Sequence, residues 1–119
     1  MEYYKLPAYN KARELTEQIT RSTQKVPRDI RFSYVTKMQT ASMGIMEHIA
    51  FANENPEERV AYLDKAIQDL HTIMIRVRIL KDLKYLPTKG YSAIIRKEEE
   101  LVRQLTGWLN KTTESNNKH

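Results

Sequence analysis

Apolar residues recur along this chain at spacings of three and four, the period of a helix with one buried face. Four such segments, separated by short polar or proline-containing connections, predict helices over about residues 7–25, 30–53, 56–84 and 88–112. The proline at position 7 suits the first turn of the first helix. The apolar positions that predict a buried core are Ala8, Ala12, Leu15, Ile19, Val35, Met38, Ile45, Ile49, Ala52, Val60, Leu63, Ile67, Leu70, Met74, Val77, Tyr91, Ile94, Leu101, Leu105 and Trp108.

The third segment contains a stretch with a second interpretation, IMIRVRILKDLKYL at residues 73–86. Apolar and basic residues alternate there from 75 to 79, a pattern typical of a half-buried strand. The helical repeat nevertheless runs from residue 60 to beyond 80 without a turn residue, and such context outranks local strand propensity. We therefore expect a helix, on which Arg76 and Arg78 lie about 200° apart and flank the apolar stripe.

The clearest start signal in the chain precedes this third helix. Asn55 suits the N-cap position, and Pro56 suits the first helical position. Glu58 is placed so that its side chain could bind the backbone N–H of Asn55, which would complete a capping box. The sequence therefore predicts that the Asn55 side chain caps the third helix.

The fold class that follows is all-α, an antiparallel up-down four-helix bundle with left-handed packing, because connections of a few residues reverse the chain direction. A chain of 119 residues suffices for one domain with a real core, and three glycines and four prolines agree with long helices. We expect a single domain over 1–112 and a disordered polar tail over 113–119. Counted from the turns, Trp108 falls level with Gly44 and is expected to pack against it and Ala41.

Charge is distributed unevenly over this bundle. Residues 21–37 and 76–97 surround the same end, and they hold twelve Lys or Arg against two acids, a net charge of +10. The rest of the chain therefore carries −5. We call this end the basic pole, and its cations are Arg21, Lys25, Arg28, Arg31, Lys37, Arg76, Arg78, Lys81, Lys84, Lys89, Arg96 and Lys97.

A one-sided basic pole suits a polyanion, with phosphate neutralisation and counterion release as the source of affinity. The alternative is that these are ordinary surface cations without a ligand. No base-reading motif accompanies these cations. We therefore expect all of them except Lys89 to bind a nucleic acid through its backbone and shape rather than its base sequence. RNA, DNA and a hybrid remain open as ligands. Tyr34, Tyr85 and Tyr91 lie near the pole, either to stack on bases or to pack in the core.

The second and third helices carry more apolar surface than one core stripe needs. The excess widens the core or forms a subunit interface, because a small bundle rarely leaves such a patch in water. The candidate interface residues are Met43, Met46, Ile73, Ile75 and Ile79. The same surface would suit a helical protein–protein adaptor, for which the basic pole is incidental.

Patterns for catalysis and metal binding are missing from the sequence. There is no Glu-x-x-His pair, P-loop or GxGxxG, and His48 and His71 fall about 15 Å apart along the bundle. The absence of cysteine excludes disulfides. The longest uncharged run is nine residues, too short to span a membrane, and no signal segment begins the chain. We expect a cytoplasmic protein without enzymatic activity, cofactor, metal or membrane contact.

Once the helices are placed, short motifs occur in a fixed order over residues 6–111. They are Leu6-Pro7, Pro27-Arg28-Asp29 with Arg31-Phe32, Leu80-Lys81-Asp82-Leu83 with Tyr85-Leu86, and Gly107-Trp108-Leu109. In order and spacing they resemble the four-helix-bundle superfamily of the accessory variability determinant (Avd) of diversity-generating retroelements and the 23S rRNA intervening-sequence proteins. The Pro-Arg-Asp turn and Gly-Trp-Leu are closer to the Avd branch.

The resemblance implies a homopentameric barrel of bundles with a positive, funnel-like surface. On the Avd side it implies binding to a reverse transcriptase and RNA, so that mutagenic cDNA is made, whereas the intervening-sequence branch has no well-established role. Matching motifs support only Arg28, Arg31 and Lys81 among the pole cations. The expected function is a non-catalytic nucleic-acid-binding accessory protein, with the branch and the protein partner left open.

Overall fold

The chain is built from helices, as its sequence predicts. A computed structural model describes residues 1–117, and no strand occurs in that range. The long helices are α1 (Pro7–Ser22), α3 (Lys37–Glu54), α4 (Arg59–Asp82) and α5 (Thr88–Asn117). The short elements are the 3₁₀ helix η1 (Tyr3–Lys5), α2 (Arg28–Arg31), the π-helix η2 (Phe32–Thr36) and the 3₁₀ helix η3 (Pro56–Glu58).

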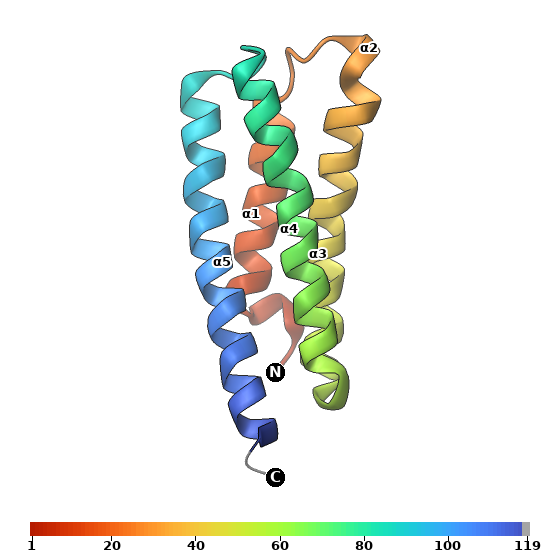
Figure 1. The fold of residues 1–119 in the computed structure, drawn as a ribbon, viewed down its shortest axis with the longest axis vertical. Coiled ribbons are helices and arrows are strands. Elements are labelled where there is room, and N and C mark those ends of the chain that lie inside the picture. Colours follow the sequence, from red (N-terminus) through yellow and green to blue (C-terminus); the bar gives the residue numbers. More distant parts are fainter. Residues whose placement is uncertain (118–119) are drawn as a thin grey trace.

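The four long helices run alternately up and down the molecule (Figure 1). α1 and α4 each pack against both α3 and α5, so α3 and α5 occupy opposite corners of the bundle. The body is 51 Å long and 22 Å across. The connections after α1 and after α4 meet at one end, the upper one in Figure 1, and this arrangement confirms the predicted up-down topology.

The core contains the positions that the helical period predicts, apart from Val60, which is only partly buried and lies outside the core cluster. Leu15, Leu70 and Leu101 are fully buried, and each such side chain stabilises the fold by about 1.5–3 kcal/mol relative to an exposed one. Truncating Leu70 to alanine would cost about 2–5 kcal/mol, because the cavity left behind adds to the lost burial. Trp108 is only partly buried, since it lies at the margin of the core.

The helix that begins at Arg28 contains a π-turn that the sequence did not predict. α2, η2 and α3 follow one another without a break, and η2 inserts one extra residue into a turn. The insertion rotates the preceding residues by about 100° relative to a regular α-helix. Ile30 consequently packs against the core, whereas Phe32 points away from it and is 72% exposed.

Helix ends differ from the prediction by a few residues, as is usual for frayed termini. α1 ends at Ser22, three residues before the predicted end at 25. α5 continues past 112 to Asn117, so residues 113–117 are helical rather than a disordered tail. Residues 118 and 119 lie outside the described part of the chain.

The predicted capping box before α4 does not form. The Asn55 side-chain amide donates to the Phe51 carbonyl at 2.9 Å, and its backbone N–H donates to the same oxygen at 3.0 Å. Asn55 therefore closes the C-terminus of α3. The 3₁₀ turn η3 then leads into α4, whose first residues have no side-chain cap.

The connection between α4 and α5 is a tight helix-ending motif. The N–H of Tyr85 donates to the Leu80 carbonyl and that of Lys84 to the Lys81 carbonyl, both at 2.9 Å. This pair of hydrogen bonds defines a Schellman motif, in which one residue adopts the left-handed conformation. Lys84 occupies that position with φ 65°, where glycine is the usual residue.

Candidate nucleic-acid interface

The predicted cations of the basic pole gather around the two connections at the upper end of Figure 1. On the first side these are Arg21 at the end of α1, Lys25 in the connection, Arg28 and Arg31 in α2, and Lys37 at the start of α3. On the second side these are Arg76, Arg78 and Lys81 in the last two turns of α4, Lys84 in the connection, and Lys89, Arg96 and Lys97 in α5. Arg96 and Lys97 lie about 12 Å or more along α5 from its start, so they flank the pole.

Few cations of the basic pole have an acidic partner. Arg21 lies 3.9 Å from a Glu17 oxygen, and Lys97 lies 3.5 Å from a Glu14 oxygen. Over residues 1–117, the other ten of the twelve cations have no carboxylate within 4 Å. Within residues 1–117, these ten charges are therefore not neutralised by a direct ion pair.

Two of these cations also hold the pole together. Arg31 donates through Nη1 to the Thr23 carbonyl at 2.7 Å, which ties α2 to the end of α1. Arg76 donates through Nε to the Ser33 carbonyl at 3.1 Å, which ties α4 to η2. Their charges add to the field of the pole, but part of their donor capacity is already used.

The three tyrosines near the pole follow the second of the two alternatives open from the sequence, packing in the core. Tyr34, Tyr85 and Tyr91 are all partly buried and pack against the core, which leaves them poorly placed to stack on bases. The ammonium of Lys81 lies 4.9 Å from the centre of the Tyr91 ring, a cation–π contact. Phe32 is an aromatic ring that the pole exposes. Its exposure could not be predicted from the sequence, because its orientation depends on the π-turn.

The acidic run after Lys97 is partly buried at Glu98 and Glu100 and exposed at Glu99. Burial raises the pKa of the Glu98 carboxyl, and repulsion from Glu99 raises it further, while Arg78 and His71 on α4 partly oppose the shift. Glu100 instead pairs with Lys11 on α1 at 2.9 Å. That hydrogen bond lowers the pKa of Glu100 and raises that of Lys11.

The candidate interface residues separate into buried and exposed groups. Ile73 is fully buried between neighbouring helices, so its assignment to a subunit interface is wrong. Met46 is partly buried and packs against the core. Met43, Ile75 and Ile79 are 48%, 59% and 39% exposed.

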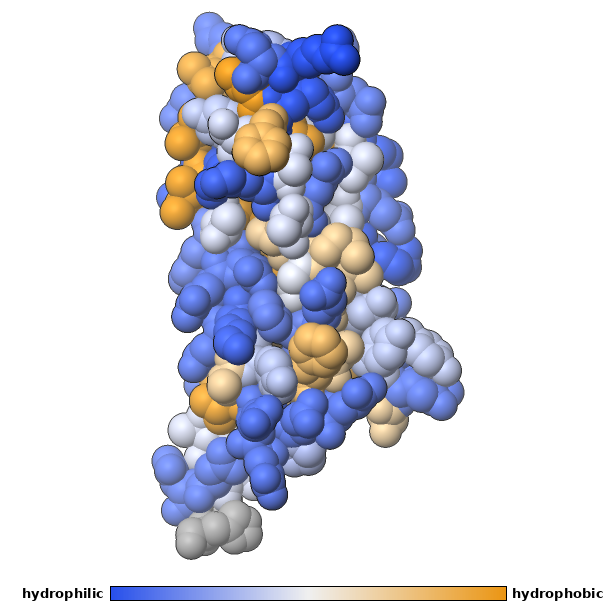
Figure 2. Space-filling model, turned by 90° about the vertical axis from the view of Figure 1, so that its right-hand side faces the viewer, coloured by the Kyte–Doolittle hydropathy of each residue, from blue (hydrophilic) through white to orange (hydrophobic). Residues whose placement is uncertain are grey.

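An apolar stripe follows the outward face of α4 near the basic pole. We call it the α4 outer stripe, and it consists of Ile75, Ile79 and Leu83, four residues apart and therefore on one face. Figure 2, a view onto the right-hand side of Figure 1, shows apolar surface next to the strongly hydrophilic upper end. Exposed apolar surface of this kind marks interaction sites in small proteins.

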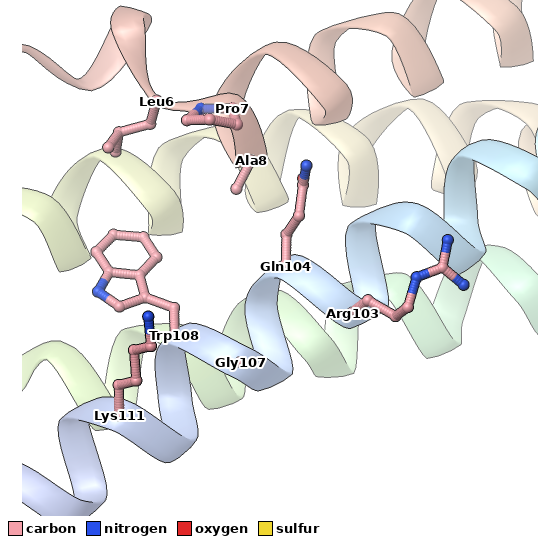
Figure 3. A pocket seen from close by; sticks show the side chains of 8 residues that line it. All are labelled: Leu6, Pro7, Ala8, Arg103, Gln104, Gly107, Trp108 and Lys111. Atoms are coloured by element: carbon pink, nitrogen blue, oxygen red, sulfur yellow. The ribbon is translucent and has the colours of Figure 1, made fainter.

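The groove around Trp108 lies towards the opposite end of the bundle (Figure 3). It has a volume of about 430 Å³ and lies between α5 and the start of α1, with Leu6 and Pro7 facing the indole. The Arg59 guanidinium lies 5.6 Å from the ring centre. Because α3 and α5 are at opposite corners, the predicted packing of Trp108 against Gly44 is wrong.

Gly44 faces α4 instead. A Cβ added at Gly44 would lie 2.8 Å from Oδ2 of Asp69, so glycine permits a close approach of the two helices. The same Asp69 oxygen lies 2.8 Å from Nδ1 of His48. Burial raises the pKa of Asp69, and the hydrogen bond with His48 partly offsets the effect. His48 is thus a helix residue whose side chain pairs with Asp69 on the neighbouring helix.

Residues 1–117 contain no cluster of His, Cys, Asp or Glu that could hold a metal ion. Over the same range, no helix has the length and apolar character needed to cross a membrane. Among residues 1–117, the basic pole is thus the main concentration of charge, with the α4 outer stripe beside it and the Trp108 groove towards the other end.

Comparison with known protein families agrees with the motif resemblance. A family model described as bAvd-like matches residues 8–112, which reach into all four long helices. The chain belongs to the bAvd-like family. This bAvd-like membership confirms the predicted resemblance, and the family is one of non-catalytic accessory proteins. No curated protein matches the chain.

Proposed function

We propose that this bAvd-like chain is a non-catalytic, nucleic-acid-binding accessory protein, resembling the Avd partner of a retroelement reverse transcriptase. One observation carries the proposal: ten cations at one end of the bundle have no carboxylate within 4 Å among residues 1–117. On an ordinary solvated surface, positive and negative side chains are usually interspersed. A surface that binds a polyanion instead gathers positive charge on one side.

The physical basis of binding is the release of counterions from phosphates by Lys and Arg. Each neutralised phosphate of B-DNA contributes about 0.9 to the slope of log affinity against log salt concentration. Contacts of this kind fix a nucleic acid on the surface without reading its sequence. The proposed activity is therefore to hold RNA, DNA or a hybrid near a protein partner.

We also propose that the chain assembles into a homopentamer, with the basic poles gathered on one rim. The number five is what the family resemblance implies, and the structure adds exposed apolar residues that one bundle leaves uncovered, the α4 outer stripe and Met43. The stripe lies beside the pole, so parallel subunits joined there would combine their fields.

A salt series tests the proposal. The triple variant Lys25→Gln, Arg28→Gln, Arg78→Gln removes exposed pole cations that make no hydrogen bond holding the fold, and the matched variant Lys65→Gln, Arg103→Gln, Lys111→Gln removes the same charge elsewhere. We expect the pole variant, but not the matched variant, to bind labelled RNA or DNA more weakly than the wild type. Its slope of log affinity against log salt concentration should also be shallower. Equal binding by both variants, with unchanged melting temperatures, would contradict the proposal.

A helical protein–protein adaptor is the alternative that the α4 outer stripe supports. An adaptor would keep its partner when the pole cations are removed and lose it when Ile79 becomes charged.

Genomic context separates the two branches of the resemblance. A neighbouring reverse transcriptase with template and variable repeats supports the Avd role, and a location within a 23S rRNA gene supports the intervening-sequence role.

A further inference from the structure

Phe32 is the aromatic ring that the basic pole presents to solvent. It is 72% exposed, compared with 43% for Phe51, the other phenylalanine, which lies near the far end of α3. The π-turn over Phe32–Thr36 sets this orientation by turning the ring away from the core. π-turns inside α-helices are frequent at functional sites, because they aim a side chain that a regular helix would place elsewhere.

The surroundings of Phe32 are cationic. Arg28 precedes it by one helical turn, and Arg76 reaches across from α4 to the carbonyl of Ser33 at 3.1 Å. Lys37 follows on α3. Over residues 1–117, none of these three cations has a carboxylate within 4 Å. The ring thus has unneutralised positive charge on either side.

A hollow of about 870 Å³ opens beside the ring, between α4 and the helix that contains Phe32. Lys37 and Arg76 line its end near the basic pole, whereas Glu47 and Asp69 line its far end. Along the helices, Glu47 lies about 15 Å from Lys37 and Asp69 about 10 Å from Arg76. The charge gradient along the hollow favours a phosphate near Phe32 and disfavours one deeper inside.

We propose that Phe32 is a stacking platform for an unpaired base, so that the basic pole prefers single-stranded nucleic acid to a duplex. An aromatic ring flanked by cations is how proteins bind single strands without sequence preference, since every base has a face to stack. In a duplex the bases are stacked on one another, and the ring gains no such contact. This inference rests on the proposed function and specifies its substrate class.

Fluorescence anisotropy tests the inference with three labelled probes: a 12-nucleotide oligo(dT), a 12-nucleotide oligo(U) and a 12-base-pair DNA duplex. We expect Phe32→Ala to weaken binding of the single strands about fivefold or more, the lower end for one base–aromatic stack. Duplex binding should change less than about twofold and the salt slope should stay the same, because no phosphate contact is lost. Phe32→Trp should retain wild-type affinity, and Phe51→Ala is the matched control.

The outcomes separate the inference from the function on which it rests. Equal weakening of duplex and single strands, or no effect of Phe32→Ala while the triple pole variant binds poorly, overturns the inference alone. If neither variant changes binding, the proposed function fails as well. A lower molecular mass for Phe32→Ala by light scattering would overturn the inference too, by placing the ring between two copies of the chain. A loss confined to oligo(U) or oligo(dT) supports the platform and assigns it to that nucleic acid.

Discussion

Lys84 is the residue at which the charge of the basic pole and the stability of the fold are opposed. Its left-handed backbone conformation, with φ 65°, brings Cβ close to the following carbonyl oxygen. The strain is about 1 kcal/mol or more relative to glycine. A lysine held at a position suited to glycine is consistent with a functional demand for charge at the tip of the pole.

Replacing Lys84 separates these two effects. We expect Lys84→Gly to raise the free energy of unfolding by about 0.5–1 kcal/mol, measured by urea denaturation, and to weaken nucleic-acid binding at low salt. Lys84→Gln is the control, because it removes the same charge and keeps the strain. A glycine variant no more stable than the glutamine variant would show that the connection is not strained.

Single residues were predictable where the helical period alone decides their environment. Leu15, Leu70 and Leu101 follow the repeat and are fully buried. Ile73 departs from its assignment because α4 packs against both α3 and α5, which widens its buried face beyond one stripe. The exposure of Phe32 was not predictable, since it results from a π-turn, and that turn contains no proline or glycine to mark it in the sequence.

At the scale of helices, two glycines in α5 have opposite roles. A Cβ at Gly90 would lie 2.6 Å from Oγ and 2.9 Å from Cβ of Ser22, because the start of α5 presses against the end of α1. A Cβ at Gly107 would have no neighbour within 4 Å. Glycine is therefore needed for packing at the first position, whereas at the second it only weakens the helix.

Alanine substitutions in α5 should consequently have opposite signs. We expect Gly107→Ala to stabilise the fold by up to about 1 kcal/mol, the difference in helix propensity. Gly90→Ala should destabilise it by about 1–3 kcal/mol, the usual cost of overpacking. Chemical denaturation of both variants checks the prediction, and a stabilising Gly90→Ala would mean that α1 and α5 can separate without loss.

The contact between α4 and α5 should depend on pH through Glu98. The folded chain raises the pKa of this carboxyl above its ordinary value of 4.5, so its ionised form is disfavoured in the fold. The resulting cost is absent below pH 4.5, appears as the pH rises through the folded pKa, and persists at neutral pH. Glu98→Gln should therefore be more stable than the wild type at pH 7 but not at pH 4.

Thermal melts at the two pH values measure this difference, with Glu114→Gln, an exposed position of α5, as the control. A gain that is the same at both pH values would show that ionisation of Glu98 is not its cause.

The four long helices were predictable because their apolar period is sustained over many residues. Asn55 was assigned to the wrong helix, since an asparagine between two helices can close one as readily as it opens the next.

For the whole molecule, the basic pole could be located from the sequence because topology alone decides which charges share an end. Short connections fix the up-down order, and the order places residues 21–37 and 76–97 together. Which cations stay unpaired depends on side-chain geometry between helices, as with Lys97 and Glu14, so it required the structure. The same is true of Arg31 and Arg76, whose hydrogen bonds reach distant carbonyls.

Assembly should depend on the α4 outer stripe. Ile75→Glu places a charge at the most exposed residue of this stripe. We expect the substitution to reduce the molecular mass from about five chains to one chain of 14.1 kDa. Ala61→Glu, an exposed position near the other end of α4, is the matched control. Size-exclusion chromatography with light scattering measures the mass. An unchanged mass for Ile75→Glu would exclude the stripe as the subunit contact.

Ten cations of the basic pole have no carboxylate within 4 Å among residues 1–117, and they repel one another in a body only 22 Å across. This mutual repulsion opposes the folded state and acts most strongly on the two connections that bear the charges. A polyanion that neutralises the pole removes the repulsion, so binding and folding strengthen each other. The proposed nucleic-acid binding would therefore also raise the free energy of unfolding, most of all at the two connections of the basic pole.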